Sequence, residues 1–192
     1  MIQELTEIQL DRAAGAVVGS ALGDALGAPY EFGPPHSDDF IPELGPGMGG
    51  EEPGAWTDDT AMAIPILEAY AANCDGDDGD NTQRIIDGWY RWIAEDGRGI
   101  GQQTFRVLSQ ARRDPTVSGL LTYSELHHNR QRFSGGNGAL MRIAPLPLGS
   151  LRDYDGEGAQ LWNRRASDLV RETRTIAQLT HWEDDNGDAC VL

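Results

Sequence analysis

The chain has 192 residues, enough for one domain with a buried core and short for two. Its formal net charge is −16, which opposes binding to nucleic acid and to anionic membranes. Every basic residue is arginine, and the lack of lysine excludes Schiff-base catalysis and a phosphate-loop lysine. Cys74 and Cys190 have no CxxC partner, so neither a zinc site nor a disulfide framework is expected. This cysteine usage fits a reducing compartment, and we expect a cytoplasmic protein.

The first predicted helix begins at a capping box, because Thr6 is followed by Gln9 and then by apolar residues at helical spacing. Glycine recurs every four positions on this helix, at Gly15, Gly19 and Gly23. Each glycine costs about 1 kcal/mol relative to alanine in a helix interior. Close approach by another helix or by a ligand would offset this cost, and we also expect this helix at the centre of a bundle.

The rest of the chain also reads as helical, with no apolar alternation typical of a strand. A loop rich in glycine and proline is expected over residues 33–55. Further helices are predicted over about 58–72, from Asn81, over 102–112, over 118–130 and over 159–181. The fourth of these carries His127 and His128, which point to different sides and are expected to be an exposed pair and not a metal site.

The densest group of chemical side chains is the tetrapeptide Thr57-Asp58-Asp59-Thr60, at the head of the second helix. Two adjacent carboxylates between two hydroxyls provide hard oxygen ligands, and magnesium usually takes one or two protein carboxylates and keeps several waters. A helix N-terminus also favours anionic side chains. These four residues alone favour a helix cap, with Thr57 or Asp58 as the N-cap, over a metal site.

Three other segments carry polar residues in glycine-rich or helix-terminal contexts. They are residues 23–31 (GDALGAPYE), 134–142 (SGGNGALMR) and 179–181 (LTH). Each has a structural explanation when taken singly. Glu31 can be a solvated surface carboxylate, the glycines can form a turn, and His181 can interact with the dipole at a helix C-terminus.

In this order, the four motifs resemble those of the ADP-ribosylglycohydrolase family, from about residue 10 to the end. The resemblance implies an all-α, orthogonal multi-helix bundle with two Mg²⁺ ions in a cleft, Mn²⁺ being an alternative. It also implies hydrolysis of the bond between ADP-ribose and an amino-acid side chain. In that family Thr57, Asp58 and Asp59 would be metal ligands. Glu31 would be the gating or acid–base glutamate beside the metals, with Asp58 and Asp59 also at the catalytic centre.

The resemblance further implies that the glycine-rich segment wraps the diphosphate and the adjoining ribose. The residues implied for this substrate binding are Ser134, Gly135, Gly136, Asn137, Gly138 and, at the ribose end, His181. Backbone N–H groups of glycine approach phosphate oxygens closely because no Cβ blocks them, which suits a chain without lysine. The implied partner is an ADP-ribosylated protein or ADP-ribosyl small molecule, with no nucleic acid and no membrane.

The chain departs from the family pattern at its C-terminal end. The family has a second aspartate-rich metal motif, of the type D-x-D-D/N-T, well beyond its histidine, whereas this chain ends at Leu192, soon after His181. We therefore expect residues 1–192 to form a single incomplete domain, truncated at the C-terminus, which a second chain supplying the missing aspartates would complete. Two alternatives remain open: a non-catalytic ADP-ribose-binding or crystallin-like relative, and an inactive fragment lacking the second metal motif.

Overall fold

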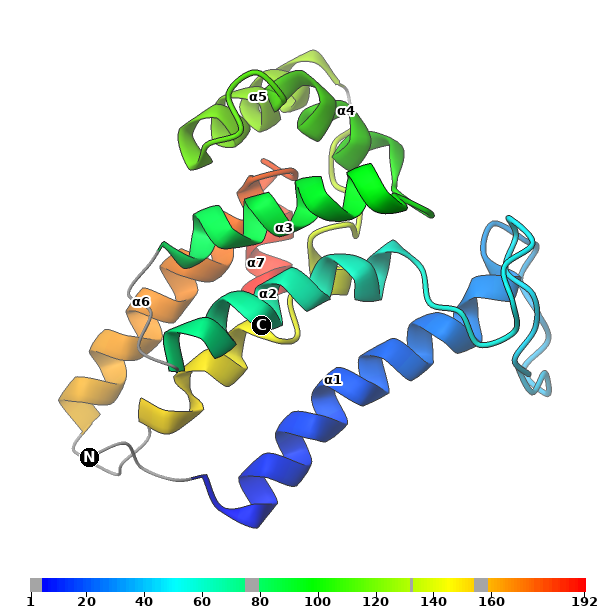
Figure 1. Cartoon of the computed structure of the whole chain (residues 1–192), viewed down its shortest axis with the longest axis horizontal. Helices are drawn as coiled ribbons and strands as arrows, with labels where there is room; N and C mark the ends of the chain where they lie inside the picture. Colours follow the sequence, from blue (N-terminus) through cyan, green and yellow to red (C-terminus); the bar gives the residue numbers. More distant parts are fainter. Residues whose placement is uncertain (1–4, 75–79, 132, 154–158) are drawn as a thin grey trace.

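The computed structural model of the chain describes residues 5–74, 80–131, 133–153 and 159–192. Over these ranges the chain is helical and contains no strand, which confirms the predicted fold class (Figure 1). The described helices are α1 (Glu7–Gly27), η1 (Ala28–Tyr30), α2 (Asp58–Cys74), α3 (Asn81–Glu95), α4 (Gln102–Ala111), α5 (Val117–Arg130), η2 (Leu140–Arg142), η3 (Leu146–Asp153), α6 (Ala159–Gln178) and α7 (Asp184–Val191). None of them is long and apolar enough to cross a membrane.

Local side-chain chemistry sets where the helices begin. At the start of α1, Thr6 and Gln9 form the predicted capping box, in which each side chain accepts a hydrogen bond from the other residue's backbone N–H. At the start of α3 the cap is Asp80, one residue before the predicted Asn81. Its carboxylate accepts hydrogen bonds from the backbone N–H groups of the second and third residues of α3.

The core lies where α2 packs against α3, with α6 and the η2–η3 segment closing it. Its fully buried side chains include Met62, Ile66, Ile85, Ile86, Trp89, Leu108, Leu120, Leu146, Ile176 and Leu179. Helix α2 runs on through Pro65, which is buried against Gly88 of α3. A Cβ atom at Gly88 would lie 2.5 Å from Cβ of Pro65, so only glycine permits this approach of the two helices.

Helix α1 packs against α2 (Figure 1), and its glycine-bearing face is uncovered within the described residues. A Cβ atom added at Gly15, Gly19 or Gly23 would meet nothing within 4 Å. The expectation that these glycines lie at the centre of a bundle is therefore wrong for the described chain. The neighbouring Val18 and Leu22 are 55% and 61% exposed, because nothing in the described residues packs on this face.

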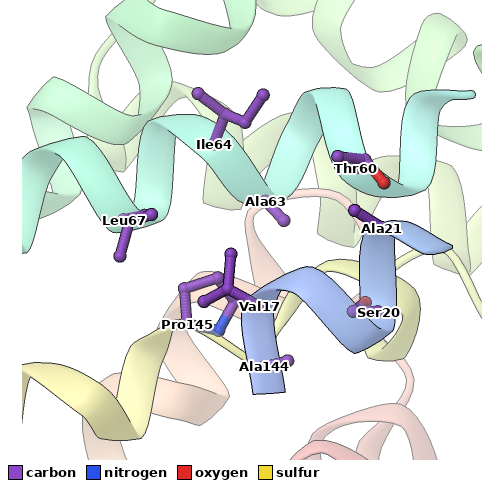
Figure 2. A pocket seen from close by; sticks show the side chains of 9 residues that line it. All are labelled: Val17, Ser20, Ala21, Thr60, Ala63, Ile64, Leu67, Ala144 and Pro145. Carbon is purple, nitrogen blue, oxygen red and sulfur yellow. The ribbon is translucent and has the colours of Figure 1, made fainter. Parts of the chain in front are cut away.

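Helix α1 meets α2 and the segment before η3 across a shallow apolar furrow of about 20 Å³ (Figure 2). The residues that line it are Val17, Ser20, Ala21, Thr60, Ala63, Ile64, Leu67, Ala144 and Pro145. Most of the side chains from α1 in this furrow are small, so the helix approaches α2 closely but buries little area against it. The better anchored end of α1 is its C-terminal end, where Ala25 is buried.

Candidate functional site

The acidic cluster at the head of α2 is organised by a residue of α1. Both carboxylate oxygens of Asp24 accept hydrogen bonds from the backbone N–H of Thr57, each at 3.0 Å. The same carboxylate accepts the hydroxyl protons of Thr57 at 2.7 Å and Thr60 at 2.6 Å, and the backbone N–H of Thr60 at 3.0 Å. Asp24 therefore caps α2 from outside the helix, a role that sequence reasoning assigned to Thr57 or Asp58.

Asp58 is buried beneath the loop between α3 and α4. The backbone N–H of Gly101 donates to its Oδ2 at 3.3 Å. Gly99 has φ of +75°, and a Cβ atom there would lie 3.0 Å from Asp58 Oδ1. The positive φ and the tight contact both require glycine at this position. The loop thus encloses the Asp58 carboxylate, which is only 7% exposed.

The carboxylates of the cluster interact with one another. The pKa of Asp58 is raised to about 7, mainly by burial and secondly by the negative charge of Asp59. The pKa of Glu31 is raised by burial and then by Asp59 and Asp24. The pKa of Asp59 is raised by burial and then by Asp24, although a hydrogen bond from Thr57 opposes the shift. The structure therefore places Glu31, Asp58 and Asp59 close enough together to repel, as expected for a site that binds positive charge.

The cluster borders a cavity of about 180 Å³. Glu31 and Thr57 line one side of this cavity, and Trp56, Arg98 and Gly99 contribute further walls. Arg98 forms an ion pair with Asp96 at 2.6 Å, on the surface. The cavity is open and mixed in polarity, so it offers both hydrogen-bonding groups and an aromatic surface to a small ligand.

The donor set suits a hard cation that keeps much of its water. No three His, Cys, Asp or Glu side chains among the described residues converge to hold a metal ion. Thr57 donates its hydroxyl proton to Asp24, which leaves the oxygen lone pairs available, and Asp58 and Asp59 add carboxylate oxygens. Magnesium is commonly bound by only one or two carboxylates. These oxygen donors are of the kind that Mg²⁺ binds, and among the described residues they do not form a closed cage.

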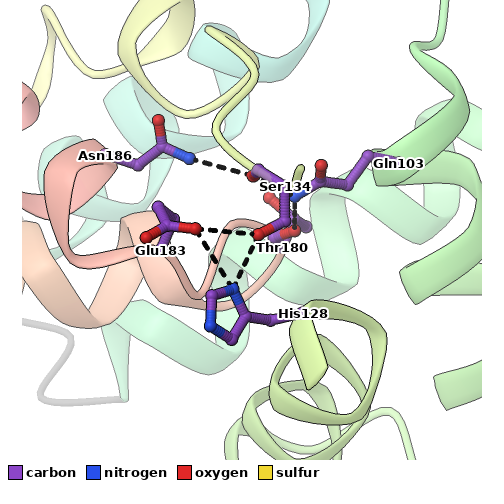
Figure 3. Close-up of polar contacts among 6 residues, drawn as sticks. All are labelled: Gln103, His128, Ser134, Thr180, Glu183 and Asn186. Atoms are coloured by element: carbon purple, nitrogen blue, oxygen red, sulfur yellow. Dashed lines mark hydrogen bonds and ion pairs between the residues drawn. The ribbon is translucent and has the colours of Figure 1, made fainter. Parts of the chain in front are cut away.

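The glycine loop begins at a polar clamp around the buried Ser134 (Figure 3). His128 Nδ1 lies 2.6 Å from Ser134 Oγ, which donates to Glu183 Oε2 at 3.1 Å. The backbone carbonyl of Ser134 accepts from Gln103 at 3.0 Å and from Asn186 at 3.3 Å. Ser134 is 3% exposed, and its side chain anchors the loop to α5 and to Glu183, the residue before α7.

This clamp does not have the geometry of a hydrolytic triad. Glu183 contacts the same nitrogen of His128 that faces Ser134, at 3.3 Å, whereas a triad carboxylate binds the opposite ring nitrogen. The neighbouring His127 is buried at 7% exposure. The prediction of an exposed histidine pair is wrong, because α5 packs on α4 and the residues near His128 belong to the loop and to the segment before α7.

Beyond Ser134 the loop passes over His181. Gly135, Gly136 and Asn137 are exposed, whereas His181 is 2% exposed and lies behind them. A Cβ atom at Gly138 would lie 2.7 Å from His181 Cε1 and 2.9 Å from Nε2. The structure therefore brings together the glycine loop and His181, two of the groups singled out in the sequence.

The N-terminal turn of α4 connects the acidic cluster to the glycine loop. Gly101 donates to Asp58, as described above, and two residues later the Gln103 side chain donates to the carbonyl oxygens of Ser134 and Thr180. No hydrogen bond joins the cluster and the loop directly within the described residues. Sequence reasoning missed Gln103, which carries no local signal, and missed the role of Asp24, although its GDALG motif was recognised.

Replacing Gly138 by alanine is expected to lower the free energy of unfolding by about 1–3 kcal/mol, because the added methyl group would overlap the buried His181 ring. Gly136→Ala is the matched control, since its Cβ would lie at an ordinary 3.6 Å from His181 Nε2. Urea unfolding followed by circular dichroism measures both variants. Equal losses for the two would contradict the predicted contact.

Comparisons with known proteins show which family this chain resembles. The family model described as ADP-ribosylglycohydrolase matches residues 5–192. The chain is 27% identical over 186 residues to the ADP-ribosylarginine hydrolase Tri1 of Pseudomonas putida (strain GB-1), a match that covers 97% of this chain and 46% of that protein. It is 30% identical over 149 residues to the ADP-ribosylhydrolase ARH3 of Gallus gallus, covering 71% of this chain and 39% of that protein.

A solved structure described as an ADP-ribosylglycohydrolase-related protein complex is also similar. It superposes with a TM-score of 0.68 at 28% identity, and the match covers 97% of this chain and 54% of that one. The chain thus spans less than half the length of the two relatives named above. Since the family model extends over nearly all of its residues, the chain belongs to the ADP-ribosylglycohydrolase family.

Proposed function

We propose that this chain supplies the ADP-ribose site of a hydrolase that removes ADP-ribose from a modified amino-acid side chain. The observation that carries the proposal is the N-terminal turn of α4, which holds Asp58 on one side and the loop beginning at Ser134 on the other. The carboxylates proposed for the reacting sugar and the backbone N–H groups proposed for a diphosphate are thereby linked through one helical turn. The substrate is an ADP-ribosylated protein or ADP-ribosyl small molecule.

The carboxylates act where the glycosidic bond breaks. Cleavage of a ribosyl bond develops positive charge at the anomeric carbon, which nearby carboxylates stabilise. Glu31 lines the cavity beside Thr57, and burial and neighbouring charges raise its pKa, so it is suited to take a proton from an attacking water. Acid–base help of this kind contributes typically ~10²–10⁴-fold to the rate.

Thr57, Asp58 and Asp59 are the residues that would hold Mg²⁺, or Mn²⁺ as the alternative. Such a cation, when bound, orients the ribose hydroxyls and lowers the pKa of a coordinated water. Asp24 contributes by accepting a hydrogen bond from the Thr57 hydroxyl at 2.7 Å, which orients that hydroxyl. Asp24 thus serves as a positioning residue for the head of α2.

The glycine loop acts at the diphosphate. Gly135, Gly136 and Asn137 are exposed, so their backbone N–H groups are available to an anion. They follow Ser134, whose hydrogen bonds hold the start of the loop in place. Gly138 approaches His181 closely, so that ring would lie behind a nucleotide held on the loop. This arrangement binds an anion without lysine, in a chain that has none.

A non-catalytic ADP-ribose-binding protein is the second candidate. The observation that favours it is the lack of three convergent metal-binding side chains among the described residues. With fewer ligands than a closed site, the chain would bind the nucleotide without holding the cation needed for hydrolysis. A second chain that supplies further aspartates would restore the hydrolase.

Hydrolysis of an ADP-ribosyl-arginine peptide in the presence of Mg²⁺ is the test. We expect release of ADP-ribose, lowered ~10²–10⁴-fold by Glu31→Gln because the variant removes the proton acceptor. Asp11→Asn, which changes an exposed carboxylate of α1, is the control and should leave the rate unchanged.

Calorimetric titration with ADP-ribose separates the two candidates if no product is released. Binding that persists with a chelator and in Asp59→Asn would support the binding protein. If the chain neither releases nor binds ADP-ribose, both candidates are refuted.

A further inference from the structure

A buried arginine lies behind His181. The Arg142 side chain is fully buried, and its guanidinium carbon lies 4.2 Å from the ring centroid of Trp89. Its Nη2 donates to Thr180 Oγ1 at 2.7 Å and to the carbonyl oxygen of Ile176 at 3.4 Å, while Nε has no partner. No described carboxylate forms an ion pair with it. The shortest hydrogen bond of this buried cation is therefore the one to the Thr180 hydroxyl.

This contact determines the direction of the next hydrogen bond. Arginine has donors only, so Thr180 Oγ1 must be the acceptor in its contact with Arg142. The hydroxyl proton then needs an acceptor, and His181 Nδ1 lies 2.9 Å away. No other acceptor for this proton is found within the described part of the chain. If Nδ1 carried a hydrogen instead, the buried hydroxyl proton would have no partner, which is unfavourable.

The direction of this bond selects one form of the His181 ring. A neutral imidazole carries one hydrogen, and a ring that accepts at Nδ1 carries it on Nε2. Burial, followed by the charges of Arg142 and His127, lowers the pKa of His181 to about 3, so the ring is neutral near pH 7. The Nε2 side faces the glycine loop, 3.6 Å from the position of a Cβ at Gly136 and 2.9 Å from that at Gly138.

We propose that Arg142 and Thr180 are positioning residues that hold His181 as the Nε2–H tautomer, so that the ring presents a hydrogen-bond donor beneath the glycine loop. The atom it would meet there is an oxygen of the ligand, and a ligand nitrogen with an attached hydrogen would be disfavoured. The identity of that ligand as ADP-ribose rests on the proposed function, whereas the tautomer does not.

Heteronuclear NMR of the nitrogen-labelled chain at about pH 7 tests the tautomer directly, because protonated and unprotonated ring nitrogens have well-separated chemical shifts. The His181→Asn spectrum identifies the signals of this ring. We expect a protonated Nε2 and an unprotonated Nδ1 in the wild-type chain and in Thr180→Ser, which keeps the hydroxyl. In Thr180→Val we expect the Nδ1 signal to shift and the Nδ1–H form to appear.

Two spectra would overturn the proposal. One is a wild-type chain with its proton on Nδ1, which needs no variant and so does not depend on Thr180→Val folding. The other is a Thr180→Val spectrum in which both ring signals match those of the wild type. Thr180→Ser separates loss of the hydroxyl from a general disturbance of the core, because only the valine change removes the donor.

Calorimetry with ADP-ribose links the tautomer to binding. The Thr180→Val variant should bind roughly 3- to 10-fold more weakly than Thr180→Ser, the loss expected for one misdirected hydrogen bond. Equal affinities would show that the Nε2–H donor does not meet the ligand. If no form of the chain binds ADP-ribose, the proposed function fails, while the NMR spectra still decide the tautomer.

Discussion

Replacing Trp89 by alanine is expected to lower the free energy of unfolding by about 3–5 kcal/mol, the range for deleting a fully buried large aromatic side chain. Trp89 has no exposed surface and fills the contact between α2 and α3. Its indole N–H donates to the carbonyl oxygen of Met62 at 3.0 Å, and its ring lies under the Arg142 guanidinium. The substitution would therefore leave a cavity and also remove the aromatic face from a buried cation.

Urea denaturation followed by circular dichroism measures this loss. The exposed Trp56 provides the control, and Trp56→Ala should change stability by no more than about 0.5 kcal/mol. Trp89→Phe should fall between the wild type and Trp89→Ala, because it restores most of the volume but not the hydrogen bond. A loss below about 1 kcal/mol for Trp89→Ala would contradict the assigned core.

Asp58→Asn is expected to have the opposite effect and to raise the free energy of unfolding at about pH 8. The pKa of Asp58 is raised from 3.8 to about 7 in the folded chain, so folding is opposed when this carboxylate is ionised. An amide at this position is uncharged and still accepts from Gly101. The difference between the pKa of Asp58 in the unfolded chain and in the folded chain corresponds to a gain of roughly 2–4 kcal/mol in the free energy of unfolding of the variant. The lost interaction with the dipole of α2 reduces this gain by about 0.3–1 kcal/mol.

The pH dependence identifies the cause of this gain. Because the folded chain holds the Asp58 proton more tightly than the unfolded chain does, the wild type loses stability as pH rises from about 4 to about 7. The variant has no ionisable group at this position and lacks this pH dependence. The free energies of unfolding of Asp58→Asn and the wild type, apart from the dipole effect, should therefore converge near pH 4 and differ fully by pH 8. Asp11→Asn changes an exposed site on α1, and its free energy of unfolding should follow the same pH dependence as that of the wild type. A constant difference between Asp58→Asn and the wild type would refute the linkage.

Magnesium gives a second measurement on the same variant. A cation bound at the cluster stabilises the folded chain by mass action and offsets the repulsion between Asp58 and its neighbours. Added Mg²⁺ should therefore raise the melting temperature of the wild type at about pH 8 and have little effect on Asp58→Asn. A chelator should remove the difference.

The helices were predictable from the sequence because their signals are local. The capping box at Thr6 and the amphipathic pattern of α3 depend only on residues a few positions apart. The exposure of the glycine face of α1 was not predictable, since spacing shows which residues share a face but not whether another element covers it. The same limit applies to His127, whose burial depends on how α5 packs.

The candidate site could be predicted only in part, for a similar reason. The motifs predicted the carboxylates and the glycine loop as parts of the site, because these residue types have recognisable chemistry. The contacts that position them join residues distant in sequence. Asp24 accepts hydrogen bonds from Thr57 and Thr60, and Gln103 donates one to Ser134. Hydrogen bonds across tens of residues leave no periodicity or spacing in the chain, so only the folded structure reveals them.

The cap that α1 places on α2 constrains how relatives of this chain can diverge. Asp24 accepts hydrogen bonds from the hydroxyl and the backbone N–H of both Thr57 and Thr60. A change at Asp24 therefore leaves donors of both threonines without this acceptor, and a change at either threonine removes a donor from Asp24. Natural sequences with a non-acidic residue at the position of Asp24 should therefore also lack one or both threonines. These three positions are expected to change together during evolution, although Asp24 lies on α1 and the two threonines lie at the start of α2.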